Sequence, residues 1–267
     1  MDEVVVLGAG VGGLEVAGRM AAGARRGEYG LLLVDDEDAF AWEQVLPAPE
    51  AEAVTRRVGR PSLSTWCAAR GVRFLRDVVV AAGWRQHALR TVGDRHLPWT
   101  QLVLARGEVP CAEELAALII GPVVAKPGEP ALRPVQAPAC PLPPDVTRVP
   151  EVDATLCLRA DADAWAVGGP TVDPRTTADM GRCVARNVQR ALAHRVARPW
   201  RPPTDALADP PGWWVTAWVA RTFGLAAARA VAMELAGKTH ETGEPAGSGP
   251  RAEAGARRVP VNTGADG

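Results

Sequence analysis

The chain has 267 residues, a formal net charge of −1 and 23% charged residues, so acidic and basic groups nearly balance. That balance excludes the strongly basic face on which nucleic-acid recognition depends. The five cysteines include no C-x-x-C pair, which argues against a disulfide framework, a zinc site and a dithiol redox centre.

The first three residues, Met-Asp-Glu, are acidic where a secretory signal peptide is basic. We therefore expect a cytoplasmic protein. A chain of this length is sufficient for one large domain or for two small ones, so the order of the predicted elements has to decide between them.

The amino-terminal segment predicts one βαβ unit. The apolar run Val4–Leu7 predicts a strand, Gly12–Ala24 predicts an amphipathic helix, and Leu31–Val34 predicts a second apolar strand. The stretch between the first strand and the helix is rich in glycine, as expected where a chain turns sharply from a strand into a helix.

The glycine spacing matches the fingerprint of a dinucleotide-binding turn. Gly8 permits a tight turn, Gly10 lets the backbone approach a pyrophosphate, and Gly13 lets the helix pack closely on the strand. The unpaired N–H groups of the helix N-terminus then face the phosphates. Asp35 follows Gly13 by about 20 residues, where the fingerprint places a carboxylate that binds ribose hydroxyls.

The middle of the chain predicts β structure. Residues 40–61 are rich in proline and glutamate and predict an irregular segment. Beyond them we expect a β-meander followed by a buried strand that ends at Arg106-Gly107; the predicted strands are Val72–Leu75, Val78–Gly83, Ala88–Val92 and Leu102–Ala105. The proline-rich residues 121–150 predict an extended linker.

The remainder predicts a short buried strand at Trp165–Val167 and a helix at Thr177–Arg195. Residues 212–236 predict a tryptophan-rich apolar helix, but two arginines interrupt it, so no run reaches the roughly 20 residues of a membrane span. This helix is expected to pack on its own domain, to contact a partner subunit in a homodimer or heterodimer, or to touch a membrane surface. Residues 238–267 predict a disordered tail.

In this order, the features resemble those of FAD-dependent pyridine nucleotide oxidoreductases, most closely the type II NADH dehydrogenase and sulfide:quinone oxidoreductase branch. The stretches that carry the resemblance are VVVLGAGVGGLEVAGRM, LLLVDDEDAFAWEQVLP, LPWTQLVLARGEVP and ADAWAVGGPTVDPRTTADMGRCVARNVQRAL. They are similar to the family's amino-terminal FAD fingerprint, its second strand and flavin loop, its glycine turn and its second FAD segment. The tryptophan-rich helix stands where that branch carries its membrane-contacting helices.

The resemblance implies an α/β fold with a Rossmann-type FAD-binding domain, a parallel sheet with helices and a β-meander. It implies FAD as cofactor, and it implies the cofactor-binding residues Gly8, Gly10, Gly12, Gly13, Asp35, Asp36, Ala105, Arg106, Gly107, Gly168 and Gly169. It divides the chain into a first FAD segment (1–120), a linker in place of the NADH domain (121–150), a second FAD segment (151–200), a helical segment (201–237) and the tail (238–267).

The chain departs from the family in three places. Only about forty residues follow Gly107 before the second FAD segment, without a second glycine fingerprint, so we expect no NADH domain and no direct hydride transfer from NADH. Gly169 replaces the aspartate that holds the ribityl chain in the family. Asp179 and Met180 stand in place of the glutamines that line its quinone pocket.

Three functions remain open at this point. The chain is a flavin-dependent oxidoreductase acting on a small organic substrate, a non-redox biosynthetic enzyme on a flavoprotein scaffold, or a non-catalytic subunit that pairs with a complete homologue. Glu43, Asp179 and His87 are candidate general acids or bases, although nothing in the sequence places them together. The four histidines show no metal-ligand spacing, so the sequence predicts no metal site.

Overall fold

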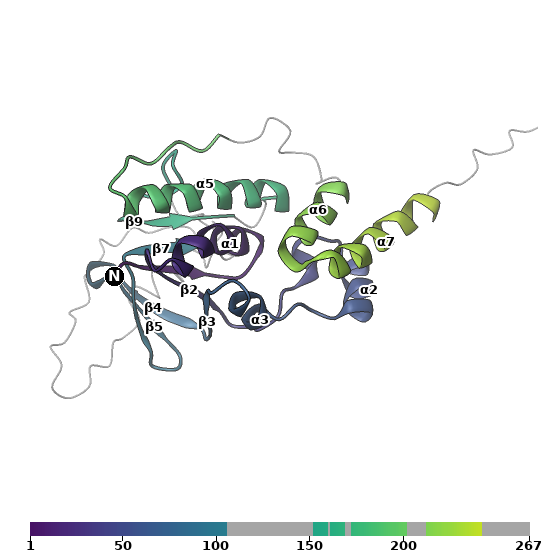
Figure 1. Ribbon diagram of the computed structural model, residues 1–267, viewed down its shortest axis with the longest axis horizontal. Helices are drawn as coiled ribbons and strands as arrows, with labels where there is room; N and C mark the ends of the chain where they lie inside the picture. The colour runs from purple at the N-terminus through teal and green to yellow at the C-terminus, as the bar shows by residue number, and fades with distance from the viewer. Residues whose placement is uncertain (106–151, 160, 169–171, 202–211, 242–267) are drawn as a thin grey trace, which may run out of the picture.

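The computed structural model describes residues 1–105, 152–159, 161–168, 172–201 and 212–241 (Figure 1). Its centre is a six-stranded sheet in which all strands but one edge strand are parallel. The strands, in spatial order, are β3 (Arg73–Arg76), β2 (Gly30–Asp35), β1 (Glu3–Leu7), β7 (Gln101–Leu104), β9 (Asp161–Ala166) and the antiparallel β8 (Cys157–Leu158). The predicted α/β fold with a mostly parallel sheet is confirmed.

Helices cover one face of this sheet and a smaller antiparallel sheet covers the other. The helices are α1 (Val11–Arg25), the 3₁₀ turn η1 (Trp42–Gln44), α2 (Ala48–Val58), α3 (Leu63–Ala68), α5 (Pro174–Leu192), α6 (Gly212–Phe223) and α7 (Leu225–Glu241). The smaller sheet holds β4 (Val79–Gly83), β5 (Ala88–Thr91) and β6 (His96–Pro98), with the 3₁₀ turn η2 (Trp84–Gln86) between the first two.

Strand alternation explains the two buried layers. In β1, Val4 and Val6 pack in the cluster that contains α1 and α5, whereas Val5 and Leu7 pack in a second cluster with Leu89 of the small sheet. Successive side chains of a strand point to opposite faces. The apolar run from Val4 to Leu7 is therefore buried on both sides, as parallel strands usually are.

Helices α1 and α5 lie against each other through glycine contacts. A Cβ on Gly181 of α5 would lie 2.8 Å from the backbone oxygen of Gly12, and a Cβ on Gly12 would overlap Val167. The absence of side chains at these two positions lets the helix backbones approach, so α5 lies beside α1 over β9 (Figure 1).

Two predictions for the segment after β2 are wrong. The stretch expected to be irregular contains η1 and α2. Its prolines do not prevent a helix, because Pro49 occupies the first turn of α2, where a missing N–H removes no helical hydrogen bond. The first strand assigned to the meander, β3, instead pairs in parallel with β2. Helices α2 and α3 connect β2 to β3. Strand β3 can therefore run in the same direction as β2. The third strand of the meander is β6, which the sequence did not suggest.

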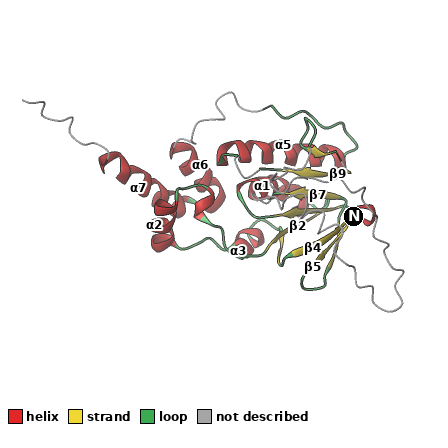
Figure 2. Ribbon diagram, turned by 180° about the vertical axis from the view of Figure 1, so that it is seen from behind, coloured by secondary structure: helices red, strands yellow, loops and turns green. Residues whose placement is uncertain are grey.

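The tryptophan-rich segment forms two helices where one was predicted. Gly224 separates α6 from α7 with a φ of +95°, a conformation in the left-handed region that favours glycine. Helix α7 continues to Glu241, so the segment expected to be disordered begins with helical residues. Figure 2 shows both helices at one end of the molecule, where α7 packs on α2 and α6 packs on α7. Within the described chain, no helix combines the length and apolar character needed to cross a bilayer.

Several predictions lie outside the described residues. They are the linker at 121–150, the rest of the tail at 242–267, and three of the candidate binding residues, Arg106, Gly107 and Gly169. The other predicted strands and helices are present with ends shifted by a few residues, as is usual for boundaries.

Candidate functional site

The turn between β1 and α1 is as tight as the glycine spacing predicts. Gly8 has a φ of +96°, and its N–H donates to Val34 O of β2 at 2.8 Å. A Cβ on Gly13 would overlap the carbonyl oxygen of Gly8. Only glycine at these two positions lets α1 begin directly above the carboxyl end of β1, which aims the helix N-terminus along that edge of the sheet.

The N-terminus of α1 presents N–H groups to a hydrogen-bond acceptor. The cap residue Gly10 has no side chain, and the first turn contains no acidic residue, so the helix itself provides no carboxylate at the positive end of its dipole. Gln44 of η1 places its Oε1 atom 3.2 Å from the N–H of Val11, which donates to it. A Cβ on Gly10 would lie 2.7 Å from the same Oε1 atom. The Gln44 carboxamide therefore lies where a phosphate oxygen binds in such turns.

Asp35 lies beside this turn. Its Oδ2 atom accepts a hydrogen bond from the N–H of Ala9 at 2.6 Å, and its Oδ1 atom accepts one from the N–H of Glu37 at 3.1 Å. Burial raises the pKa of the Asp35 carboxyl above its ordinary value; the two N–H bonds act in the opposite direction, and neighbouring Asp36 adds to the rise. A partly buried carboxylate is thus fixed next to the glycine turn.

The ends of β7 and β9 close the same edge. Ala105 continues β7, with its N–H donating to Leu7 O at 2.7 Å, and the N–H of Val167 donates to Leu104 O at 2.8 Å. The carbonyl oxygen of Ala105 lies 3.7 Å from the position of a Cβ on Gly10. Gly168 follows with a φ of +88°. The candidates that the structure brings together here are Gly8, Gly10, Gly12, Gly13, Asp35, Asp36, Ala105 and Gly168.

The three candidate acids and bases have different partners. Among the described residues, Glu43 pairs with Arg60 at 3.7 Å and Asp179 pairs with Arg182 one helical turn along α5. His87 faces a carboxylate at the amino end of β9, the opposite edge of the sheet. Each of the three is thus engaged with a partner of its own, and His87 lies away from the glycine turn.

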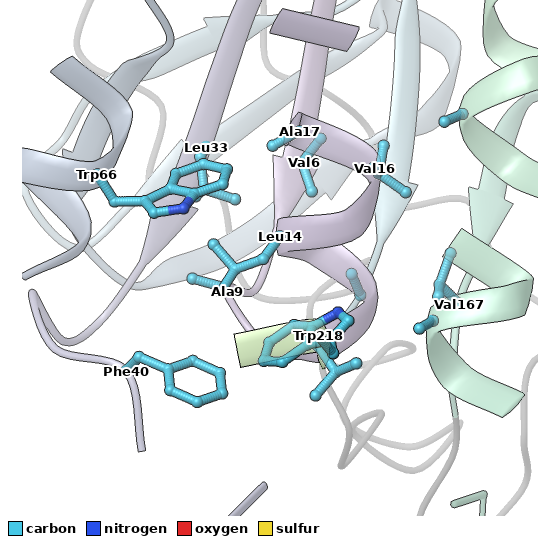
Figure 3. Packing of buried hydrophobic residues seen from close by; sticks show 14 of the residues in the cluster. Val6, Ala9, Leu14, Val16, Ala17, Leu33, Phe40, Trp66, Val167 and Trp218 are labelled. Atoms are coloured by element: carbon cyan, nitrogen blue, oxygen red, sulfur yellow. The ribbon is translucent and has the colours of Figure 1, made fainter. Parts of the chain in front are cut away.

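Helix α6 covers the region next to the turn with aromatic side chains. Trp218 is 1% exposed and lies 5.7 Å, ring centre to ring centre, from Phe40, the residue that precedes η1 by two positions (Figure 3). Phe40 also contacts Trp42 of η1 at 5.6 Å. This aromatic cluster fixes the segment that carries Gln44.

Polar contacts hold α6 in this place. Glu15 of α1 is buried, and its carboxylate accepts a hydrogen bond from Arg221 of α6 at 3.0 Å. The carbonyl oxygen of Thr222, near the end of α6, accepts hydrogen bonds from Trp66 Nε1 and Arg70 Nη2, each at 2.9 Å. The helix is therefore attached to both α1 and α3.

Sequence reasoning missed Gln44 as a residue of this site. It stands 34 residues after Gly10 in a stretch whose prolines hid the short helices. The tripeptide Trp-Glu-Gln gave no signal of its own, because the contact joins Gln44 to Val11, 33 positions away in the sequence.

No protein-family model matches the chain, and no curated protein sequence matches it. Part of the chain is similar to the solved sulfide:quinone oxidoreductase of Aquifex aeolicus, with 20% identity and a TM-score of 0.35 over 41% of this chain and 25% of that one. It is also similar to NADH:rubredoxin oxidoreductase of Clostridium acetobutylicum, with 14% identity and a TM-score of 0.31 over 40% of this chain and 28% of that one.

An NAD-dependent persulfide reductase from A. fulgidus is similar as well, with 17% identity and a TM-score of 0.31 over 41% of this chain and 23% of that one. The chain spans about a quarter of the length of these solved structures. A likeness of this strength concerns the path of the chain alone and carries nothing about ligand or activity.

Proposed function

We propose that this protein binds FAD at the carboxyl edge of the parallel sheet and serves as a flavin-dependent oxidoreductase for a small organic substrate, without taking hydride directly from NADH. One observation carries the proposal: the Asp35 carboxylate lies 2.6 Å from the N–H of Ala9, inside the glycine turn. An adenosine diphosphate needs a donor-rich helix N-terminus and a ribose-binding carboxylate side by side.

The residues present fit the adenosine diphosphate half of FAD. The missing Cβ of Gly10, the uncharged first turn of α1 and the oxygen acceptor already seated on Val11 N–H all suit a phosphate group. Binding would require the Gln44 carboxamide to leave Val11. The flavin half would extend toward Ala105 and Gly168, where two strands end.

When bound, the flavin would supply hydride or electron transfer. The chain's own contribution would be to bind and orient. Asp35 would hold the ribose, the first turn of α1 would hold the pyrophosphate, and the aromatic cluster of Phe40, Trp42 and Trp218 would exclude water from the adjoining side. The lack of a second glycine fingerprint supports an electron donor other than NADH.

A calorimetric titration with FAD tests the proposal, with Asp35→Asn as the test variant. The substitution removes the charge that strengthens hydrogen bonds to the ribose hydroxyls, so we expect FAD affinity to fall about tenfold or more. The matched control is Asp2→Asn, because Asp2 is exposed at the amino end of β1. Equal FAD affinity in wild type and Asp35→Asn would contradict this use of the site.

One observation favours a second function. Gln44 already fills the acceptor position, as it would in a scaffold that no longer binds a nucleotide and serves as a non-redox enzyme or a partner subunit. If neither wild type nor a Gln44→Ala variant binds FAD, that second function replaces the first.

A further inference from the structure

A second cluster of chemically active side chains lies at the opposite edge of the sheet from Asp35. His87 projects from the turn between η2 and β5, and Asp161 and Asp163 stand at the amino end of β9. One ligand atom from each lies within 4.8 Å of the other two, and His87 Nε2 is 3.8 Å from Asp161 Oδ2. Residues 74 positions apart in the sequence thus meet where the small sheet joins the parallel sheet.

Among the described residues, His87 is the one group that could offset the charge of the two carboxylates. Within the described part of the chain, no arginine or lysine forms an ion pair with Asp161 or Asp163, and His87 is the one basic group beside them. The side chain of Asp161 is 11% exposed. Two carboxylates held this close and partly out of water favour a cation between them.

The surroundings orient both carboxylates. Asp161 Oδ1 accepts a hydrogen bond from the N–H of Asp163 at 2.9 Å. Asp163 Oδ1 accepts one from Gln101 Nε2 at 2.7 Å, and Gln101 Oε1 in turn accepts one from Nε1 of the buried Trp165 at 2.7 Å. One oxygen of each carboxylate is therefore fixed and the other remains for a ligand, which is how outer contacts orient metal ligands.

Trp99 packs against the imidazole of His87. Its side chain is buried, with 4% exposure, and its ring stacks on the His87 imidazole at 4.2 Å with an interplanar angle of 7°. The Trp99 Nε1–H has no acceptor among the described residues. A buried donor without a partner costs about 1–3 kcal/mol, a cost that a bound water would relieve.

We propose that His87, Asp161 and Asp163 form a binding site for a divalent transition-metal ion, Zn²⁺ above all. One imidazole nitrogen with two carboxylate oxygens suits zinc better than calcium or magnesium, which prefer oxygen ligands alone. Three protein ligands leave a fourth position for water. The ion joins the small sheet, through His87, to β9 of the parallel sheet, and so stabilises the contact between the two layers. The proposal is independent of FAD.

The test uses the full chain freed of metal with a chelator and then titrated with Zn²⁺ by calorimetry, with thermal unfolding followed in parallel. Wild type is expected to bind one equivalent and to unfold at a higher temperature with Zn²⁺, because an ion that binds only the folded state stabilises it. His87→Gln and Asp163→Asn are each expected to lose at least tenfold in affinity and most of the shift in Tm.

His96→Gln is the matched control, because this exposed imidazole of β6 belongs to the same small sheet but lies outside the cluster. It should bind Zn²⁺ as wild type does. Circular dichroism in the absence of metal establishes whether each variant is folded. If Asp163→Asn does not fold, His87→Gln alone tests the proposal, because it changes a half-exposed side chain. Absence of a bound equivalent in wild type, or wild-type affinity in a folded His87→Gln protein, would overturn the proposal.

Discussion

At the scale of single residues, the contact between Gln44 and Val11 occupies the turn at which we propose that FAD binds. The Gln44 Oε1 atom accepts the hydrogen bond that a phosphate oxygen would otherwise accept. A neutral hydrogen bond of this kind contributes about 1 kcal/mol. The side chain is therefore a weak intramolecular competitor that a charged diphosphate can displace.

We expect Gln44→Ala to strengthen FAD binding about fivefold, which corresponds to about 1 kcal/mol of competition removed. Calorimetric titration measures the change. Gln86→Ala, in η2 on the far side of the sheet, is the control and should bind as wild type does. Weaker binding by Gln44→Ala would mean that the carboxamide contacts the bound nucleotide, contrary to the arrangement described above.

Cys67 provides a pH prediction at the same scale. Burial raises the pKa of its thiol from 9.0 to about 12, since a thiolate cannot be hydrated in the core against which α3 packs. The unfolded chain then loses its proton first as the pH rises. The stability that depends on the neutral thiol is complete below about pH 9 and is lost progressively between about pH 9 and about pH 12.

Between pH 8 and pH 10, the free energy of unfolding of wild type should therefore fall by about 1.4 kcal/mol more than that of Cys67→Ala. Urea unfolding at the two pH values measures the difference, and the other cysteines cancel because both proteins contain them. Equal losses in the two proteins would show that the thiol is hydrated in the folded state.

At the scale of elements, α6 is a structural cover over the amino end of α1. Trp214 and Trp218 are buried, whereas Trp213 on the same helix is 68% exposed. These three tryptophans of the segment expected to contact a partner or a membrane thus have different surroundings. Two belong to the core, and Trp213 alone remains available for a partner or a membrane surface.

Trp218→Ala should lower the free energy of unfolding by about 3–5 kcal/mol, the usual cost of removing a large buried aromatic side chain. Trp213→Ala should change it by less than about 0.5 kcal/mol. Chemical denaturation of the two variants makes the comparison. A small effect of Trp218→Ala would mean that α6 does not pack on Phe40 in solution.

The elements that sequence patterns predicted correctly are the local ones. The unit β1–α1–β2 depends on apolar periodicity and on glycines within 35 residues, and its register follows from the tight turn at Gly8. The pairing of β3 with β2 and the break at Gly224 depend on contacts between distant segments. A propensity summed along the chain does not contain that information.

At the scale of the whole molecule, the glycine turn with Asp35 and the cluster around His87 also differ in whether their residues are close in the sequence. The glycines and Asp35 could be predicted because one short segment carries them. Gln44, and the cluster of His87, Asp161 and Asp163, could not be predicted, because each needs the sheet to bring remote residues together. The first site lies at the carboxyl edge of the parallel strands and the second at the amino edge.

The sheet keeps these two edges apart, and this separates the two proposals. A change at His87 should alter the stability of the layered fold without altering FAD affinity. A change at Asp35 should alter FAD affinity without altering Zn²⁺ affinity. Each variant is thereby a control for the other.

The absorption spectrum of gently purified protein tests the central claim most directly, together with mass spectrometry of whatever acid treatment releases. We expect a flavin spectrum at close to one equivalent, or its appearance on titration with FAD, and a released mass equal to that of FAD. A colourless protein that FAD does not titrate, either as wild type or as Gln44→Ala, would contradict the claim that the glycine turn and Asp35 hold this nucleotide.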